Sequence, residues 1–398
     1  MDLWPSEVEN LVISSAFWLG KRVFVTGHTG FKGSWLSLML SRLNAKTTGY
    51  ALAPPSTPSL FDLADVGDVV ADVRGDIRDL ASLRAAMVAA SPEIVIHMAA
   101  QPLVRASYAD PVETYSTNVM GTVNVLEAAR SCDALRAVVI VTTDKCYQNN
   151  DWVWGYRETD RLGGHDPYSN SKACAELVTG AYRDSFFDAQ GVAKILSARA
   201  GNVIGGGDFA ADRIIPDAVR AFLAGRALHV RNPAATRPWQ HVLEPLTGYL
   251  MLAEAAAAGR AEFEGGWNFG PGVDADQTVE TLLERFIAAW GRDGANDPRW
   301  THDAGPHPHE ARLLRLDASK ARATLNWEPL LSFADTADWT AQWYRAFADG
   351  LSPLQTTLTQ IDRYLGQRVR LVSPFAKDQS TQDSIEKEDH AERLVRHS

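Results

Sequence analysis

The sequence predicts an α/β fold in which a doubly wound parallel sheet carries helices on both faces and a smaller lobe follows it. Three observations support this prediction: short apolar runs alternate with helical patterns over residues 21–141, a glycine-rich turn follows the first run, and the sequence texture changes near residue 201. Near-continuous apolar strands that alternate with helices are typical of parallel sheets covered on both faces. The 398 residues suffice for a large core with an appended lobe.

The elements of the sheet follow one another in a strand–helix order. β-Branched or fully apolar runs predict strands at 22–26, 47–52, 69–73, 93–97 and 137–141. Helical patterns lie between them at 31–43, 80–90 and 112–130. The Asp-Pro pair at 110–111 is a helix-start signal for the last of these. Such connections between parallel strands are right-handed crossovers.

The second half of the chain predicts a lobe that closes a cleft against the strand ends. We expect helices at 168–190, 214–223, 244–259 and 278–290, and loops at 201–207 and 231–240. Residues 17–200 are assigned mainly to a dinucleotide-binding domain that carries the catalytic residues, and 201–350 mainly to a substrate-binding lobe. Open α/β sheets bind ligands at the carboxyl ends of their strands. The polar, charge-mixed segment 373–398 predicts a disordered tail.

Composition excludes several classes of protein. Lys and Arg total 39 against 49 for Asp and Glu, a net charge of -10, which argues against a general nucleic-acid or membrane binder. Three cysteines at irregular spacing fit neither a disulfide framework nor a zinc cage. Without a signal-like start or an apolar run long enough to span a bilayer, we expect a cytoplasmic protein.

A glycine fingerprint lies directly after the first strand. Residues 27–33 read Gly-His-Thr-Gly-Phe-Lys-Gly and open the first helix. Such glycines allow a tight turn and let backbone N–H groups approach a pyrophosphate. An ordinary glycine turn is the alternative, but the strand–turn–helix context favours a dinucleotide. The residues expected to hold it are Gly27, Thr29, Gly30, Phe31 and Gly33.

The fingerprint alone does not separate NAD from NADP. The acidic residue that usually follows the second strand is missing from residues 50–55, and no arginine stands there for a 2′-phosphate. After the third strand, Asp76 beside Ile77 is placed to bond the adenine amino group. The alternative for Asp76 is the N-cap of the helix that starts at Leu80.

Tyr168 and Lys172 form a candidate redox pair. They stand four residues apart, so a helix brings both side chains to one face. A lysine cation one turn away lowers a tyrosine pKa and fits the phenol to accept a proton from an alcohol. The spacing alone is a weak motif, and its setting gives it weight.

The triplet Thr143-Asp144-Lys145 follows the fifth strand and adds an acid and a base. The Thr143 hydroxyl could share a substrate proton with Tyr168, whereas a surface turn is the alternative. Lys145 becomes a proton acceptor if desolvation and neighbouring cations disfavour its charge. Asn118, inside the helix at 112–130, is expected to be an architectural residue beside the site, or else an exposed helix residue.

Two arginines predict a phosphorylated substrate. Arg213 and Arg237 stand in apolar or proline-rich settings on either side of the predicted cleft. The planar guanidinium suits a diphosphate. A His-Pro-His-Glu run at 307–310 lacks further ligands at a fitting spacing, so we expect no metal site.

These motifs resemble the extended short-chain dehydrogenase/reductase superfamily and, within it, the CDP-glucose 4,6-dehydratases. The resemblance extends over about residues 17–343. The matching segments are 23–35, 97–105, 143–147, 152–158, 167–172, 199–208 and 237–245. The related dTDP-glucose enzymes carry Asp-Glu where this chain has Asp144-Lys145.

The resemblance implies a Rossmann-type fold with bound NAD, CDP-glucose as substrate, and a product that feeds deoxysugars into surface polysaccharide such as O-antigen. Tyr168, with Thr143, would take the C4 hydroxyl proton, Lys145 would remove the C5 proton, and Asp144 would protonate the departing C6 hydroxyl. Lys172 would hold the nicotinamide ribose. By the same resemblance Ala99 would contact the cofactor, and Asn202 and Arg237 the substrate diphosphate, with the acid–base split between Asp144 and Lys145 left open.

Two other functions remain open at this point. A sugar-nucleotide epimerase of the same superfamily would need Tyr168 and Lys172 but not the Asp144-Lys145 pair. A non-catalytic dinucleotide-binding regulator would leave Tyr168 and Lys172 idle. The resemblance also implies a homodimer, in which the helices at 112–130 and 168–190 form a four-helix seam.

Overall fold

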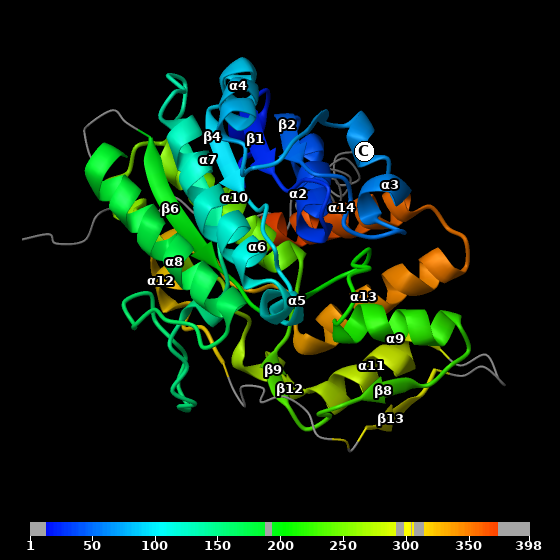
Figure 1. The fold of residues 1–398 in the computed structure, drawn as a ribbon. Coiled ribbons are helices and arrows are strands. Elements are labelled where there is room, and N and C mark those ends of the chain that lie inside the picture. Colours follow the sequence, from blue (N-terminus) through cyan, green and yellow to red (C-terminus); the bar gives the residue numbers. More distant parts are fainter. Residues whose placement is uncertain (1–12, 188–192, 292–297, 304, 306–313, 373–398) are drawn as a thin grey trace, which may run out of the picture.

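A seven-stranded sheet forms the centre of the protein (Figure 1). The structure, a computed structural model, describes residues 13–187, 193–291, 298–303, 305 and 314–372. The predicted tail at 373–398 and the His-Pro-His-Glu run at 307–310 lie outside the described residues. Every pair of neighbouring strands in the sheet is parallel. The predicted doubly wound α/β class is therefore confirmed.

The strand order places a topological switch point between β1 and β4. In sheet order the strands are β3 (Ala71–Arg74), β2 (Lys46–Ala51), β1 (Arg22–Thr26), β4 (Ile94–His97), β5 (Ala137–Val141), β6 (Lys194–Arg199) and β11 (Gly265–Asn268). The connection from β3 to β4 crosses back over β1 and β2 and reverses the winding. Open sheets of this order bind dinucleotides at that reversal.

Both faces of the central strands are buried, which explains their continuous apolar runs. In β1, Val23 and Val25 belong to one hydrophobic cluster and Phe24 to the other. The same alternation divides Ile96 from Val95 in β4. Because successive side chains of a strand point to opposite faces, each face needs its own cover of helices.

Helices cover the two faces of the sheet as separate layers (Figure 1). One layer contains α4 (Leu80–Ala90), α6 (Pro111–Tyr115), η2 (Ser116–Met120), α7 (Gly121–Ala129), α8 (Pro167–Tyr182) and η4 (Arg183–Phe187). The other contains α2 (Phe31–Arg42), α10 (Leu243–Ala257), α14 (Pro353–Val372) and α12 (Ser319–Leu325). Shorter helical segments are α1 (Ser15–Trp18), α3 (Leu60–Leu63), η1 (Val66–Asp68), α5 (Val104–Ala109), η3 (Asp144–Cys146), η5 (Ala261–Phe263) and η6 (Val273–Ala275).

Most predicted helices of the first half are confirmed with small shifts of their ends. The helix expected at 112–130 is α6 and α7 with the π-helical turn η2 between them. The helix expected at 168–190 is α8 followed by the π-helical turn η4, and residues 188–190 lie outside the described part. The strand expected at 69–73 is wrong by two residues at its start, because η1 precedes β3 there.

The C-terminal lobe lies beyond the carboxyl ends of the strands (Figure 1). It contains α9 (Ile214–Leu223), α11 (Val279–Trp290), α13 (Phe333–Ala348), β8 (Leu228–Val230), β9 (Thr236–Pro238), β12 (Asp276–Thr278) and β13 (Trp300–His302). The prediction of a loop throughout 231–240 is wrong at β9, which pairs antiparallel with β12. That pairing joins segments about forty residues apart, so no local sequence pattern predicts it.

Four of the described elements from beyond residue 200 belong to the sheet and its helix layers and not to the lobe: β11, α10, α12 and α14. Strand β11 extends the central sheet beside β6, and α10 packs on β5 and β6. A short parallel pair, β7 (Val203–Ile204) with β10 (Gln240–His241), connects the sheet to the lobe. The chain thus crosses more than once between the two parts that the sequence separates at residue 200. In the described part, no helix is long and apolar enough to cross a membrane.

Candidate active site

The glycine turn approaches the backbone after β4 more closely than any side chain allows. A Cβ at Gly27, which has φ +78°, would lie 2.7 Å from the Ala99 amide nitrogen. A Cβ at Gly33 would lie 2.1 Å from the Gly27 carbonyl oxygen. The two glycines therefore let the turn pack against the next strand end and against its own helix, as a dinucleotide turn requires.

The start of α2 is open to an anion. Its N-cap is Gly30, and no side chain caps the first turn. The backbone N–H groups of such a turn lack intrahelical partners and suit a pyrophosphate. Thr29 donates its hydroxyl to the Leu52 carbonyl at 3.0 Å, which ties the turn to the end of β2. Phe31 lies beside Gly205 of the C-terminal lobe. These residues fit a bound dinucleotide.

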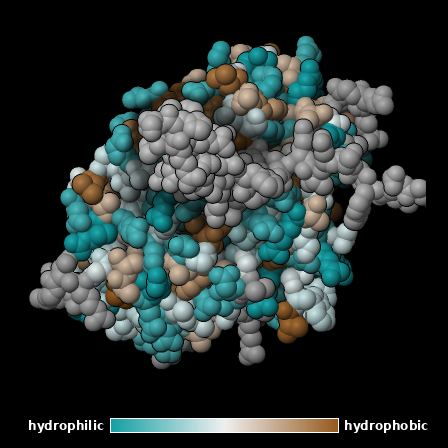
Figure 2. All heavy atoms as spheres, turned by 180° about the vertical axis from the view of Figure 1, so that it is seen from behind, coloured by the Kyte–Doolittle hydropathy of each residue, from teal (hydrophilic) through white to brown (hydrophobic). Residues whose placement is uncertain are grey.

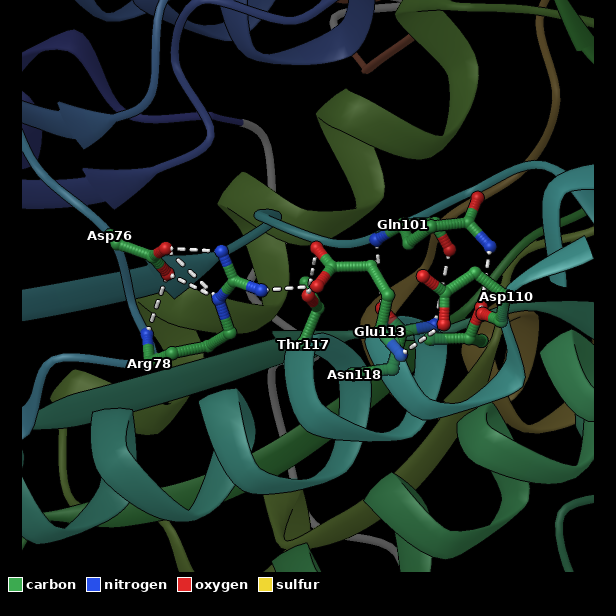
Figure 3. Close-up of polar contacts among 8 residues, drawn as sticks. Asp76, Arg78, Gln101, Asp110, Glu113, Thr117 and Asn118 are labelled. Atoms are coloured by element: carbon green, nitrogen blue, oxygen red, sulfur yellow. Dashed lines mark hydrogen bonds and ion pairs between the residues drawn. The ribbon is translucent and has the colours of Figure 1, made fainter.

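At the expected adenine end, Asp76 lies in a cluster of charges (Figure 3). The Arg78 guanidinium lies between the carboxylates of Asp76 and Glu113, and it donates from Nε to Asp76 at 2.9 Å. Hydrogen bonds from Arg78 lower the Asp76 pKa. The alternative of a helix cap is wrong, because Asp79 caps α4. Contact of Asp76 and Ile77 with adenine remains a prediction.

Asn118 connects three segments around the site, and Figure 3 shows its hydrogen bonds to Gln101. Its Nδ2 donates to the Gln101 carbonyl at 3.0 Å and to the Ser171 hydroxyl at 2.9 Å. Its Oδ1 accepts from the Gln101 amide at 2.8 Å. Asn118 is buried, so the alternative of an exposed helix residue is wrong. It lies in the π-helical turn η2, a feature often found at functional sites.

Three polar side chains follow one another along a single face of α8. Tyr168, Lys172 and Glu176 are all buried and stand four residues apart. Lys172 donates to the Val141 carbonyl at 3.1 Å. Burial lowers the Lys172 pKa to about 8, although Glu176 opposes this. Tyr168 and Lys172 are the predicted pair. The same four-residue spacing in the sequence could also have revealed Glu176.

The expected lowering of the Tyr168 pKa by Lys172 is wrong for this structure. Burial raises the Tyr168 pKa to about 12, while Thr143 and Arg213 act in the opposite direction. Lys172 is not among the groups with the largest effect on the Tyr168 pKa, and its ammonium donates to the Val141 carbonyl at the end of β5. The charges that face the phenol belong to Asp144, Arg213 and Asp166.

Glu176 connects α8, which carries Tyr168 and Lys172, to the ends of two strands. It forms a buried ion pair with Arg199 at 2.8 Å and accepts hydrogen bonds from Thr142 and Ser197. Thr142 immediately precedes the triplet Thr143-Asp144-Lys145. Every polar partner of Glu176 is therefore on β6 or at the end of β5, which holds α8 in register with the sheet.

The triplet after β5 brings its acid and its base together. Thr143 donates to Asp144 Oδ1 at 2.8 Å, and the Lys145 ammonium lies 3.8 Å from the same oxygen. Asn202 donates to Asp144 Oδ2 at 3.4 Å. Asp144 is buried, whereas the Lys145 side chain is 39% exposed. The protein alone thus desolvates Asp144 but not Lys145.

Gly201 makes the space that Asp144 occupies. A Cβ at Gly201 would lie 1.9 Å from Asp144 Oδ2. Its neighbour Asn202 adopts a left-handed conformation with φ +50°. The loop after β6 therefore fixes the orientation of the carboxylate, a role that the glycine-rich sequence did not reveal.

Lys32 is a cation of this site that the sequence reasoning missed. It is the second residue of α2, and its ammonium makes no hydrogen bond or ion pair within the described residues. Burial and the Arg213 and Lys172 cations lower its pKa to about 7, whereas Asp144 and Asp208 oppose this. A lysine inside a phosphate-binding turn was the available signal.

The predicted substrate ligands lie at different places around the cleft. Arg213 pairs with Asp208 at 2.7 Å and acts electrostatically on Tyr168, so it belongs to the site. Arg237 lies on β9, three residues before Gln240. The backbone N–H of Gln240 donates to the Asn202 carbonyl at 3.2 Å. Binding of substrate by these residues remains a prediction. Among the described residues, no His, Cys, Asp and Glu side chains gather as a metal site would require.

Comparison with known proteins identifies the family. A family model described as GDP-mannose 4,6 dehydratase matches residues 24–340. The chain belongs to the 4,6-dehydratase family. CDP-glucose 4,6-dehydratase of Salmonella typhimurium is 50% identical over 364 residues, which are 90% of this chain and 100% of the relative. dTDP-glucose 4,6-dehydratase of Mycolicibacterium smegmatis is 29% identical over 85% of this chain and 97% of its own length.

Solved structures of the same family share the fold. A dTDP-glucose 4,6-dehydratase from Streptomyces venezuelae, solved with NAD bound, superimposes with a TM-score of 0.68 at 27% identity. The match covers 84% of this chain and 99% of that one. A UDP-glucose 4-epimerase from Stenotrophomonas maltophila reaches a TM-score of 0.70 at 19% identity, which shows a common fold only.

Proposed function

We propose that this protein converts CDP-glucose to CDP-4-keto-6-deoxyglucose and water with NAD as its cofactor. The observation that carries the proposal is the Asp144–Lys145 pair, 3.8 Å apart, next to the Tyr168 phenol. An epimerase needs Tyr168 and Lys172 alone, whereas loss of water needs an additional acid and base. The choice of CDP rests on the relative that is 50% identical.

The first chemical task of the chain is to take the C4 hydroxyl proton. NAD, when bound, supplies the acceptor for the C4 hydrogen and later returns that hydrogen to C6. Tyr168 accepts the proton of the C4 hydroxyl, and the adjacent Thr143 hydroxyl shares it. The Tyr168 pKa of about 12 makes the phenol a strong base once its proton has left, and Arg213 favours that departure.

The second task is to remove water across C5 and C6. The C4 ketone acidifies the C5 hydrogen, which Lys145 removes in its neutral form. Asp144 passes a proton to the departing C6 hydroxyl. Bound substrate covers the exposed Lys145 side chain and so supplies the desolvation that the protein alone does not. When the hydrogen returns to C6, Lys145 gives its proton back to C5. The proton that Tyr168 took from the C4 hydroxyl passes through the Thr143 hydroxyl to Asp144, which restores all the groups for the next turnover.

The third task is to hold the diphosphate of the substrate near these groups. Lys32 and Arg213 supply two cations within reach of Asp144 and Tyr168. Two such cations close together repel each other, and an anion between them relieves that repulsion. We therefore assign Lys32 to the group of Asn202, Arg213 and Arg237 as a ligand of phosphate oxygens.

A product assay separates the three candidate functions. The full chain is incubated with NAD and CDP-glucose, and the product is analysed by mass spectrometry and NMR. Loss of one water with a new C6 methyl group supports the dehydratase. An unchanged mass with inverted C4 would indicate the epimerase, and no turnover of CDP-glucose or dTDP-glucose would favour the regulator. Faster turnover of dTDP-glucose than of CDP-glucose would contradict the proposal that the nucleotide of the substrate is CDP.

We further propose that the enzyme is a cytoplasmic homodimer. Val112, Met120 and Leu177 are exposed apolar side chains on the neighbouring segments α6, η2 and α8, where a four-helix seam would bury them. The opposite face of the molecule mixes hydrophilic and hydrophobic side chains (Figure 2). The three cysteines of the chain form no disulfide bond, which supports a reducing compartment such as the cytoplasm.

Sedimentation velocity tests the dimer. Leu177→Asp should shift the protein to a monomer, because a carboxylate in an apolar seam is costly to desolvate. Leu351→Asp, an exposed leucine beyond α13, is the matched control and should leave the dimer intact. A monomeric unaltered chain at micromolar concentration would contradict the proposal.

A further inference from the structure

The structure places an arginine at the carboxyl end of β2, where the sequence of β2 itself offers neither an acid nor a base. Arg74 ends β3 and lies opposite Ala51 in the strand register. Its Nη1 donates to the Leu52 carbonyl at 3.1 Å. The same carbonyl accepts the Thr29 hydroxyl of the glycine turn at 3.0 Å. One carbonyl thus connects the guanidinium to the dinucleotide turn.

The guanidinium is held rigidly. Arg74 Nε and Nη2 donate to Asp72 Oδ2 at 3.0 and 2.8 Å, and its Cζ lies 4.8 Å from the centroid of the Phe61 ring. Asp72 Oδ1 in turn lies 2.8 Å from Nε2 of the buried His28. A preorganised guanidinium of this kind binds an oxygen ligand without first having to be ordered.

Arg74 also keeps donors for a ligand. The three hydrogen bonds described occupy three of the five N–H groups of an arginine and leave one on each Nη atom. The side chain is 40% exposed, so these donors reach solvent. A guanidinium with two open N–H groups is suited to phosphate or hydroxyl oxygens.

In doubly wound dinucleotide folds, the adenosine ribose lies at the end of the second strand. A carboxylate there binds the 2′-hydroxyl of NAD, whereas an arginine nearby accommodates the 2′-phosphate of NADP. We propose that Arg74 meets the 2′ position of the adenosine ribose and that the site accepts NADP as well as NAD. This goes beyond the NAD dependence of the proposed reaction and rests on the glycine turn being the dinucleotide site.

The neighbouring charges limit how strongly NADP is favoured. Asp72 neutralises Arg74 in part, and its carboxylate repels a 2′-phosphate. His28 adds little positive charge, because burial lowers its pKa. We therefore expect the dissociation constants of NAD and NADP to agree within about tenfold, a difference of about 1.4 kcal/mol.

Isothermal titration calorimetry of the full chain with NAD and with NADP tests this inference without relying on turnover. Arg74→Ala should weaken NADP at least about tenfold and change NAD less than about threefold, because only NADP loses a charged partner. Asp72→Asn should act in the opposite direction and tighten NADP relative to NAD. Arg130→Ala is the matched control, since Arg130 also pairs with a carboxylate and lies over an aromatic ring, at 41% exposure.

The outcomes separate this inference from the assignment of the site. NAD binding with NADP weaker by more than about a hundredfold would overturn the role of Arg74. An unchanged ratio of the two constants in Arg74→Ala would do the same. Failure of both dinucleotides to bind would instead overturn the glycine turn as the dinucleotide site, and the inference with it.

Discussion

The two ends of the dinucleotide site handle charge in opposite ways. At the catalytic end, Tyr168, Lys172 and Asp144 are buried. At the adenosine end, Arg74 and Arg78 remain partly exposed, and each is paired with an acid two residues before it in the chain. The same edge of the sheet therefore carries a buried group of titratable residues and a partly solvent-exposed group of ion pairs.

This difference separates chemistry from recognition. Burial lowers the Lys172 pKa to about 8, near neutral pH, and raises the Tyr168 pKa to about 12, which makes the Tyr168 phenolate a stronger base toward a substrate hydroxyl. At the adenosine end, hydrogen bonds from Arg78 lower the Asp76 pKa and keep the carboxylate ionised. Substitutions should therefore have large effects at the first end and small effects at the second.

The largest effect is expected for Lys145→Met. Removing the base should lower the rate of water loss by at least about a thousandfold, as for other general bases, while NAD binding stays unchanged. Product formation and calorimetry measure the two quantities. Lys21→Met is the control, since Lys21 is also partly exposed and pairs with an acid, Glu93, at the far end of the strands. Retained water loss in Lys145→Met would exclude Lys145 as the base.

Gly201→Ala should come next. The added Cβ would overlap Asp144 Oδ2 and force the carboxylate to move, and misplacement by about 1 Å costs about a hundredfold in rate. Gly366→Ala, which has open space around it in α14, should leave the rate unaltered. Steady-state kcat measures both variants. If Gly201→Ala turned over normally, the orientation of Asp144 would not matter.

Lys172 predicts the pH dependence. Its pKa of about 8 means that the cation is present below pH 8 and is lost as the pH rises above it. If the cation holds the nicotinamide ribose, kcat at saturating substrate should fall above about pH 8, whereas loss of the Lys32 cation, whose pKa is about 7, should appear as weaker substrate binding. Lys172→Arg keeps its charge to far higher pH, so its alkaline limb should move upward even though the rate drops. Identical alkaline limbs in the two proteins would exclude Lys172 as the titrating group.

The smallest effect is expected for Arg78→Ala at the adenosine end. Exposed ion pairs contribute about 0.2–1 kcal/mol, so NAD affinity should fall by less than about fivefold. Titration calorimetry measures it, and higher salt should reduce the difference further. A loss of more than about a hundredfold would show that the contrast between the two ends is wrong.

Local patterns predicted most of the sheet layer. The apolar run at Ala137–Val141 and the glycine turn after Arg22–Thr26 are both explicit in the sequence, and both are in place. Strand β11 was missed because Gly265–Asn268 has no strand-like pattern of its own, and pairing with β6 alone makes it a strand. The division at residue 200 could not anticipate this pairing, because it depends on long-range contacts.

The site was predictable as a set of residues more than as an arrangement of atoms. Helical spacing brought Tyr168 and Lys172 to one face, but the direction of the Lys172 ammonium depends on the Val141 carbonyl. Arg74 could not be assigned from its own strand, because its partner Leu52 directly follows a different strand, β2. Lys32 lies inside the glycine fingerprint at 27–33, but only the folded C-terminal lobe brings Arg213 close to it.

The central claim is that one active site oxidises C4, removes water and returns the same hydrogen to C6. A crossover experiment tests it most directly: CDP-glucose deuterated at C4 is mixed with CDP-glucose labelled with carbon-13 throughout, and the product is analysed by mass spectrometry. The account predicts deuterium at C6 in the carbon-12 product alone, with one water lost. Deuterium retained at C4 without loss of water, or deuterium in the carbon-13 product, would contradict it.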